Sequence, residues 1–241
     1  ISNKLSQLLH VSKDMYSLLN GAWDPSIVPT SYNYGFKTVE TNINQDLVVG
    51  FNYLKFIDTN TVVKDANIMI DLSSIAKGFA VDELMTYIQG RIKVKGAFID
   101  IGGEIKVVGL NAQNRPWGIG IQSPSDPNTL SDVIYSSNMM SIATSGNYLN
   151  YNNIDNVKVG HIFDARQNTA YEGSIISVSV IAKSCAIADA LATGLFAMGL
   201  DDAKTWLSTN SDFPALIISL DNKDSITKTS FNGFDRLRNP E

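Results

Sequence analysis

Two oxygen-bearing side chains stand four residues apart in an otherwise mostly apolar stretch of the chain. The stretch "AIADALATGLFAMG", residues 186–199, contains Asp189 and Thr193 among Ala, Leu, Ile, Phe and Met. Residues at i and i+4 lie on one face of an α-helix, about 5–6 Å apart. A helix here would therefore direct a carboxylate and a hydroxyl toward one point, and hard cations such as Mg²⁺ prefer oxygen ligands. The spacing predicts a helix that presents two oxygens to a cation.

A lysine and a histidine are the next candidates for chemistry. Lys77 stands in "SSIAKG", near an expected helix start, where backbone N–H groups and the helix dipole favour a phosphate. His161 opens "HIFDAR", in which strand alternation would place His161 and Phe163 on one face and Asp164 on the other. A neutral imidazole can act as a general base near neutral pH. The alternatives are a solvated lysine and a strand-end histidine bonded to backbone.

Two loops have compositions suited to contact with another molecule. "SIATSGN" offers Thr144 and Ser145 in a small, hydroxyl-rich turn that another molecule could approach closely. "GAWDP" sets Trp23 beside Asp24, where the ring could stack on a flat heterocycle while the carboxylate accepts hydrogen bonds. The alternative for this second loop is a core tryptophan and an aspartate that caps a turn.

Hydrophobic periodicity and turn residues predict the elements that would position these side chains. An amphipathic helix is expected over residues 5–21, and a second over 73–90, with serine at its start and Gly90 beyond its end. Further helices are expected at 186–199 and 201–210. Strand-like runs occupy 45–58, 61–72, 96–109, 117–123, 132–146, 161–168, 174–182 and 214–220. Many strands with short turns and few helices predict an α+β fold with mixed, largely antiparallel sheets, not a doubly wound parallel sheet.

Composition excludes several classes of protein. The 241 residues are 44% hydrophobic with a formal net charge of −5, and they lack the basic stripe that a nucleic-acid partner would require. The single cysteine, Cys185, excludes an internal disulfide and is expected to be a buried, inert thiol. The sequence has no apolar run long enough to span a membrane. The first residue is Ile1, so we expect a processed or trimmed chain, and we expect the basic residues after position 222 to form a solvated edge.

Six motifs in order resemble one known family. They are "GAWDP", "IDLSSIAKGFAVDEL", "GAFIDIGGEIKVVG", "SIATSGNY", "HIFDAR" and "VSVIAKSCAIADALATGLFAMG", spread from residue 21 to residue 199. Together they resemble the FAD:protein FMN transferases of the ApbE family. The resemblance implies transfer of FMN from FAD, with Mg²⁺, to a Thr or Ser hydroxyl of an acceptor redox protein, with release of AMP. Some members mainly hydrolyse FAD to FMN and AMP.

The resemblance also assigns roles to individual residues. It implies a metal site made of the Ser74 carbonyl and the side chains of Asp189 and Thr193. It implies His161 as the base, Asp164 as its supporter or substitute, and Lys77 as a phosphate partner. The expected flavin-nucleotide contacts, including the hydroxyl-rich turn, are Ala22, Trp23, Asp24, Asp71, Lys77, Phe163, Thr144 and Ser145.

Departures from the family pattern leave alternatives open. Ser73 and Ser74 stand where the family often has two glycines, and "DARQN" replaces "DPRTG". We expect one ApbE-like domain over residues 1–241, which lacks an N-terminal segment that family members usually carry. The family also implies a site of action outside the cytoplasm, with membrane association through an N-terminal lipoprotein anchor. The competing interpretations are an FAD pyrophosphatase and a flavin-binding protein without turnover.

Overall fold

The computed structural model describes residues 1–36, 47–147, 151–154, 157–221, 223 and 225–239. The five α-helices within these residues are α1 (Asn3–Leu18), α2 (Val28–Asn33), α3 (Ala76–Arg91), α4 (Cys185–Met198) and α5 (Leu200–Thr209). Two short 3-10 helices are η1 (Phe51–Tyr53) and η2 (Phe234–Arg238). The strands are β1 (Leu54–Asp58), β2 (Thr61–Lys64), β3 (Gly96–Ile101), β4 (Glu104–Gly109), β5 (Trp117–Gln122), β6 (Leu130–Ser136), β7 (Met140–Gly146), β8 (Tyr151–Ile154), β9 (Val157–Gly160), β10 (Phe163–Asp164), β11 (Thr169–Ala170), β12 (Ile175–Ala182), β13 (Ala215–Leu220) and β14 (Ile226–Phe231).

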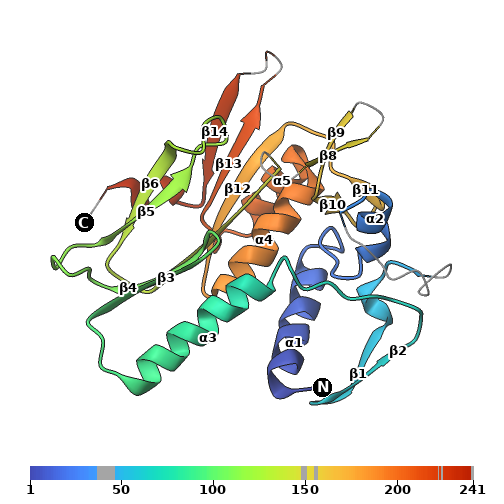
Figure 1. Cartoon of the computed structure of the whole chain (residues 1–241). Helices are drawn as coiled ribbons and strands as arrows, with labels where there is room; N and C mark the ends of the chain where they lie inside the picture. Colours follow the sequence, from blue (N-terminus) through green and yellow to red (C-terminus); the bar gives the residue numbers. More distant parts are fainter. Residues whose placement is uncertain (37–46, 148–150, 155–156, 222, 224, 240–241) are drawn as a thin grey trace.

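A six-stranded sheet in the order β14-β13-β12-β7-β4-β3 forms the centre of the molecule (Figure 1). Every strand pair in the described residues is antiparallel, including the separate hairpins β1-β2, β5-β6, β8-β9 and β10-β11. Helices α3 and α4 lie against one side of this sheet, and α1 lies beside α4 (Figure 1). The expected α+β fold with antiparallel sheets is confirmed.

The central sheet separates two hydrophobic cores, because successive side chains of a strand point to opposite faces. On β12, Val180 belongs to the core shared with α4, whereas Ile181 belongs to the core on the other face. On β13, Ile217 and Leu216 divide in the same way. The second core is closed by residues of the β5-β6 hairpin and of η2. Strands covered on both faces explain why β12 and β13 are mostly apolar, with only serines among the apolar residues.

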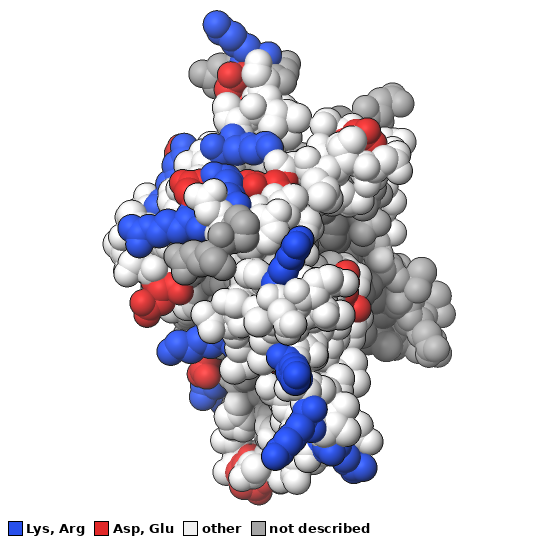
Figure 2. Space-filling model, turned by 90° about the vertical axis from the view of Figure 1, so that its left-hand side faces the viewer, with Lys and Arg blue, Asp and Glu red and all other residues white. Residues whose placement is uncertain are grey.

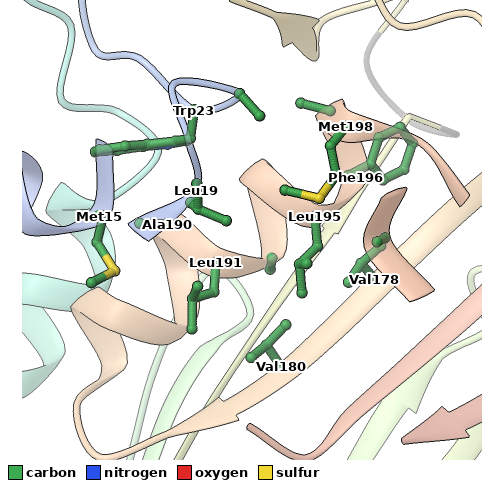
Figure 3. Close-up of a cluster of buried hydrophobic side chains, with 14 of the residues drawn as sticks. Met15, Leu19, Trp23, Val178, Val180, Ala190, Leu191, Leu195, Phe196 and Met198 are labelled. Atoms are coloured by element: carbon green, nitrogen blue, oxygen red, sulfur yellow. The ribbon is translucent and has the colours of Figure 1, made fainter. Parts of the chain in front are cut away.

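Helix α4 is buried on nearly all sides and forms the axis of the first core. Its apolar side chains contact Met15, Leu19 and Trp23 on one side and Val178 and Val180 of β12 on the other (Figure 3). A helix that is apolar all round is stable only when it is enclosed by other elements. The enclosure places the one carboxylate of α4 inside the protein.

The start and end of α3 differ from the expectation. Its N-cap is Ile75, without a side-chain hydrogen bond, and Gly90 lies inside the helix. The preceding residues form a turn in which the Ser73 N–H donates to Asp71 Oδ1 (2.9 Å), so serine serves the turn and not the cap. At the other end the Ile92 N–H still donates to the Ile88 carbonyl (3.0 Å), which carries the helix past the glycine.

Two strand expectations and the expectation for the C-terminal segment were too simple. The expected runs 45–58 and 61–72, of which residues 45–46 lie outside the described part, contain the 3-10 helix η1 and the short hairpin β1-β2, joined to irregular backbone. The run at 161–168 contributes the two-residue strand β10. The region after residue 222 is not just a solvated edge, since it supplies strand β14 and the buried Phe234, and Arg238 pairs with Asp132 (2.6 Å). Antiparallel pairing with β13, from Ala215 opposite Phe231 to Leu220 opposite Ile226, places β14 at the edge of the central sheet.

Helix length, surface charge and the single cysteine bear on the classes of protein that the composition excluded. No helix among the described residues is both long and apolar enough to cross a membrane. On the face shown in Figure 2, Lys and Arg side chains stand singly or in small groups, separated by uncharged residues and by Asp and Glu. Cys185 is buried, and burial raises the pKa of its thiol far above the usual range. The expectation of an inert thiol is confirmed.

Candidate functional site

One large cavity collects most of the candidate residues. Its volume is about 960 Å³, at the upper end of the range for small-molecule sites. It is lined by the loop at Trp23, the residues that lead into α3, the turn before β4, part of β5, the end of β7, the segment at His161 and one face of α4. Segments distant in the sequence therefore share one wall.

Asp189 is the buried carboxylate of this cavity. Its side chain is nearly inaccessible to solvent, and Oδ2 accepts a hydrogen bond from the Gly78 N–H (3.1 Å). Burial, together with repulsion from the Glu104 carboxylate, raises the pKa of Asp189 to about 7, and the Gly78 N–H and the Lys77 charge partly oppose this. A bound cation would supply the countercharge that the surroundings of Asp189 provide only in part.

The contact between Gly78 and Asp189 joins α3 to α4. Gly78 is the third residue of α3, one of the first-turn positions whose N–H has no partner within a helix, and its N–H donates to Asp189. Gly78 must be glycine, since an added Cβ would lie 2.3 Å from the Cys185 carbonyl oxygen. The close approach of α3 and α4 thus brings Ser74 and Asp189 to the same wall of the cavity.

Hydroxyl groups complete this side of the cavity. Thr193 Oγ1 lies 2.9 Å from Ser145 Oγ, and Thr144 Oγ1 lies 2.8 Å from Ser179 Oγ. Thr193, Ser145 and Thr144 all line the cavity. The predicted one-turn spacing of Asp189 and Thr193 on a helix is confirmed.

The donor set fits a magnesium ion better than it fits a transition metal. The described residues contain no group of three or more His, Cys, Asp or Glu side chains that could hold a metal. The set implied by the resemblance contains one carboxylate, one hydroxyl and one carbonyl, all oxygen. Mg²⁺ is commonly held by one or two carboxylates while it keeps water or substrate phosphate as further ligands. The buried, incompletely neutralised Asp189 is the observation that supports the fit.

Lys77 and Glu104 form an ion pair on the cavity wall, with Nζ and Oε1 2.6 Å apart. The lysine side chain is 46% exposed, whereas the glutamate side chain is 3% exposed. Lys77 therefore keeps access to a ligand while its partner lies behind it. Glu104 was not among the predicted residues, although a glutamate directly after two glycines and before an apolar strand was visible in the sequence.

His161 lies beside an aromatic group at the cavity wall. Both His161 and Phe163 line the cavity, but so does Ile162 between them, and only Phe163 belongs to a strand, so the predicted alternation does not describe this segment. The Phe36 ring centroid is 6.3 Å from that of His161 and 5.9 Å from that of Phe163, and Tyr34 stacks on Phe163 at 5.5 Å. Phe36 and Tyr34 were not predicted, because their contact with this segment crosses more than a hundred residues of chain.

Asp164 lies on the other side of its strand, away from the residues that line the cavity. Both of its oxygens accept hydrogen bonds from the Arg166 guanidinium, at 2.7–3.2 Å, and Oδ1 also accepts from the Arg166 N–H. A bidentate, buried pair of this kind orients the loop. The geometry gives Asp164 a structural contact with Arg166, and its expected support of His161 stays a prediction.

The "GAWDP" loop combines both interpretations of its composition. Trp23 is 3% exposed and belongs to the first core, and its Nε1–H donates to Ser74 Oγ (2.9 Å) at the cavity wall. Asp24 also lines the cavity, yet its oxygens accept from Ser26 N, Ser26 Oγ and Phe51 N at 2.7–3.0 Å. Trp23 is thus a core residue and Asp24 caps a turn, as the alternative interpretation had it, while both also line the cavity.

Comparison with known proteins adds an independent finding. A sequence model described as "ApbE family" matches residues 1–217, nine-tenths of the chain. The chain belongs to the ApbE family. Among curated relatives, the FAD:protein FMN transferase of Vibrio cholerae is 35% identical over 227 residues, which cover 88% of this chain and 67% of that protein. The FAD:protein FMN transferase of Haemophilus influenzae is 29% identical over 252 residues, covering 98% of this chain and 72% of that protein.

Solved structures of the ApbE family share this fold. The flavin transferase ApbE from Vibrio cholerae superposes with a TM-score of 0.83 at 30% identity, covering 98% of this chain and 77% of that one. The flavinyl transferase ApbE of Pseudomonas stutzeri gives a TM-score of 0.83 at 24% identity, covering 99% of this chain and 76% of that one, and shows the fold alone.

The residues that the ApbE resemblance implied can now be placed. Most line the cavity: Trp23, Asp24, Asp71, Ser74, Lys77, Thr144, Ser145, His161, Phe163, Asp189 and Thr193. Ala22 is fully buried beneath the wall, where its carbonyl accepts from the Ala165 N–H (3.3 Å). Asp71 connects the start of α3 to the tryptophan loop, since its N–H donates to the Pro25 carbonyl (2.7 Å). Whether each residue contacts a flavin nucleotide stays a prediction.

Proposed function

We propose that this chain is an FAD:protein FMN transferase, which moves FMN from FAD to a Thr or Ser hydroxyl of an acceptor redox protein and releases AMP. The observation that carries the proposal is the shared cavity of Lys77, His161, Asp189 and Thr193 in a member of the ApbE family. A cavity of this volume is large enough to take a dinucleotide.

The cavity residues divide the work of phosphoryl transfer. The hydroxyl oxygen of the acceptor forms a bond to the FMN phosphorus, the bond from that phosphorus to the AMP oxygen breaks, and AMP leaves with the bridging oxygen. His161 accepts the hydroxyl proton, since its ring lies at the wall and an imidazole is basic enough near neutral pH. Lys77 meets the negative charge of the pyrophosphate, aided by the N-terminal end of α3.

Three oxygen donors would hold a divalent cation opposite Lys77. They are the Asp189 carboxylate, the Thr193 hydroxyl and the Ser74 carbonyl. When bound there, Mg²⁺ supplies charge neutralisation on the pyrophosphate. Asp189 must be ionised to serve, and the Gly78 N–H on Oδ2 favours that charged form. Ser145 hydrogen-bonds to the Thr193 hydroxyl and so orients this second oxygen ligand.

The decisive experiment measures AMP release from FAD in the presence of Mg²⁺, with and without a flavin-acceptor domain, together with mass spectrometry of that domain. An FMN adduct formed in step with AMP supports the transferase. AMP without an adduct favours the FAD pyrophosphatase, and absence of both favours a flavin-binding protein without turnover. Asp189→Ala should abolish turnover that depends on Mg²⁺ while the protein stays folded.

A histidine pair in this chain gives a matched control for the base. His161→Ala should slow transfer by about 10²–10⁴-fold, while the Kd for FAD changes little, because the imidazole acts on the acceptor proton. His10→Ala should leave transfer unchanged, since His10 lies on α1, where its ring contacts Phe56 and the Ser6 carbonyl. A loss of FAD affinity alone in His161→Ala would contradict the base role.

The site of action follows from the same family resemblance. We infer that the native protein acts outside the cytoplasm, on a membrane-associated redox protein, and that it is held there by an N-terminal anchor. Fractionation of cells that express the native gene would test this inference, because a fully cytoplasmic enzyme would contradict it.

A further inference from the structure

The placement of Lys77 is unfavourable for the helix that carries it. Lys77 is the second residue of α3, where the helix dipole is positive and where a cation is destabilising. No side-chain cap offsets this charge at Ile75, and the first turn contains no acidic residue. Local helix stability therefore does not explain a lysine at this position.

The placement of Glu104 is unfavourable in a complementary way. Glu104 is 2% exposed at the start of β4, and burial raises the pKa of its carboxyl group, while Lys77 opposes that rise. Its Oε1 accepts a hydrogen bond from the Lys77 ammonium, but Oε2 is buried without a hydrogen-bond partner in the described part of the chain. Burial of a polar atom without a partner destabilises a fold. The sheet gains nothing from a glutamate here that an apolar residue would not supply.

The turn before β4 lies beside this ion pair. Gly102 and Gly103 have φ values of +67° and +100°, which side chains rarely adopt, and both line the cavity. A Cβ on Gly102 would lie 3.7 Å from Glu104 Oε2 and 3.9 Å from Lys77 Cδ. The turn leaves the ammonium open to the cavity on one side and held by the carboxylate on the other.

We propose that Glu104 is a positioning residue, which holds the Lys77 ammonium at the cavity wall so that it meets a phosphate group of the bound nucleotide. This inference rests on the proposed function, since FAD supplies the phosphate. A free lysine side chain loses much rotamer freedom when a ligand binds. The buried carboxylate restricts Lys77 before the ligand arrives. Both residues line the cavity, but the carboxylate is 3% exposed against 46% for the lysine side chain, so the ammonium is the group that a phosphate can reach.

The test measures equilibrium binding of FAD by fluorescence titration with EDTA present, so that neither turnover nor metal binding affects the result. Glu104→Leu and Lys77→Met should each raise the Kd for FAD by about tenfold, as expected for one unrestrained side chain. Glu104→Gln keeps an acceptor oxygen for the ammonium and should stay within about twofold of the parent. In steady-state assays with Mg²⁺, Glu104→Leu should change KM more than kcat.

The double variant separates positioning from a general effect on the cavity. In the Lys77→Met background, Glu104→Leu should cause no further loss of affinity, because there is no ammonium left to position. Should Glu104→Leu fail to fold, the same comparison is made with Glu104→Ala, which also removes the acceptor oxygens. Glu83→Leu is the matched control, since Glu83 is an α3 carboxylate paired with the surface residue Lys4. The Kd of this variant for FAD should equal that of the parent.

The possible outcomes are distinct. Parental affinity in Glu104→Leu, or an equal loss in the presence and absence of Lys77, overturns the positioning role while the proposed function stands. Failure of the parent protein to bind FAD, in EDTA and with Mg²⁺ present alike, overturns the proposed function, and the positioning role with it. Loss in Glu104→Leu that vanishes without Lys77 supports the inference.

Discussion

Asp189 is a carboxylate that the fold removes from water, and its ionisation is therefore coupled to stability. Its pKa is about 7 in the folded protein, against an ordinary value near 4 in an unfolded chain. The folded protein binds a proton more tightly than the unfolded chain does. Between these two values the unfolded chain loses its proton first, so stability falls as the pH rises.

This coupling predicts the behaviour of the metal-free protein. The contribution of Asp189 to the free energy of unfolding should be largest below about pH 4 and should decline as the pH rises toward 7. Asp189→Asn should remove most of that decline, because the amide does not titrate. Urea denaturation in EDTA at several pH values measures both proteins. An identical pH dependence in the two proteins would show that Asp189 is not the group responsible.

Helices α3 and α4 form the frame of the site, and their separation is set by specific residues. Gly78 permits contact with the α4 backbone, and Asp82 of α3 accepts from the N–H groups of Cys185 and Ala186 at 3.0 Å. Asp82 also pairs with Lys106 of β4 (2.6 Å), in a largely buried position. These contacts hold the first turn of α4 against α3, and Asp189 lies one turn further along α4.

Two glycines of α3 give a matched test of this frame. Gly78→Ala should destabilise the protein by about 1–3 kcal/mol, since the new methyl group would clash with the Cys185 carbonyl. Gly90→Ala should stabilise it by about 0.5–1 kcal/mol, because a Cβ there meets nothing within 4 Å and alanine is the better helix former. Urea titrations of both variants measure the difference. Equal effects would refute a close contact between the helices.

At the scale of the whole molecule, the central sheet has a core on each face and the cavity at one end. Asp189 lines the cavity from α4, on one face of the sheet. The core on the other face contributes Ile119, Ile121 and Ile142 to the lining. The geometry of the cavity therefore depends on both layers. The C-terminal segment contributes through Phe234, which is fully buried in the second core.

Truncation of that side chain tests the contribution of the C-terminal segment. Phe234→Ala should lower the free energy of unfolding by about 3–5 kcal/mol, the usual loss for a buried aromatic residue. Phe98→Ala should cost much less, since Phe98 is 37% exposed at the edge strand β3. Denaturation midpoints of the two variants provide the comparison. A small effect of Phe234→Ala would mean that the second core does not depend on the C-terminal segment.

The sequence by itself determined the features that depend on neighbours within a few residues. The helical period of α1 and α4, and the spacing that places Asp189 and Thr193 on one helix face, are local, because the α-helix repeats every 3.6 residues. The antiparallel α+β fold followed from the order of short strands and turns. Strand alternation, by contrast, does not account for the placement of His161, because β10 begins only at Phe163 and Ile162 lines the same cavity.

Only the tertiary structure decided the contacts between distant segments. The Gly78 N–H reaches Asp189 across 111 residues, and Lys77 reaches Glu104 across 27. Likewise the Arg166 guanidinium donates to Asp164, and Asp24 caps its own turn. Spacing along the chain does not specify such partners, because they are selected by the packing of α3, α4 and the sheet around a shared core. That packing, and not any single motif, turns a set of candidate residues into one cavity.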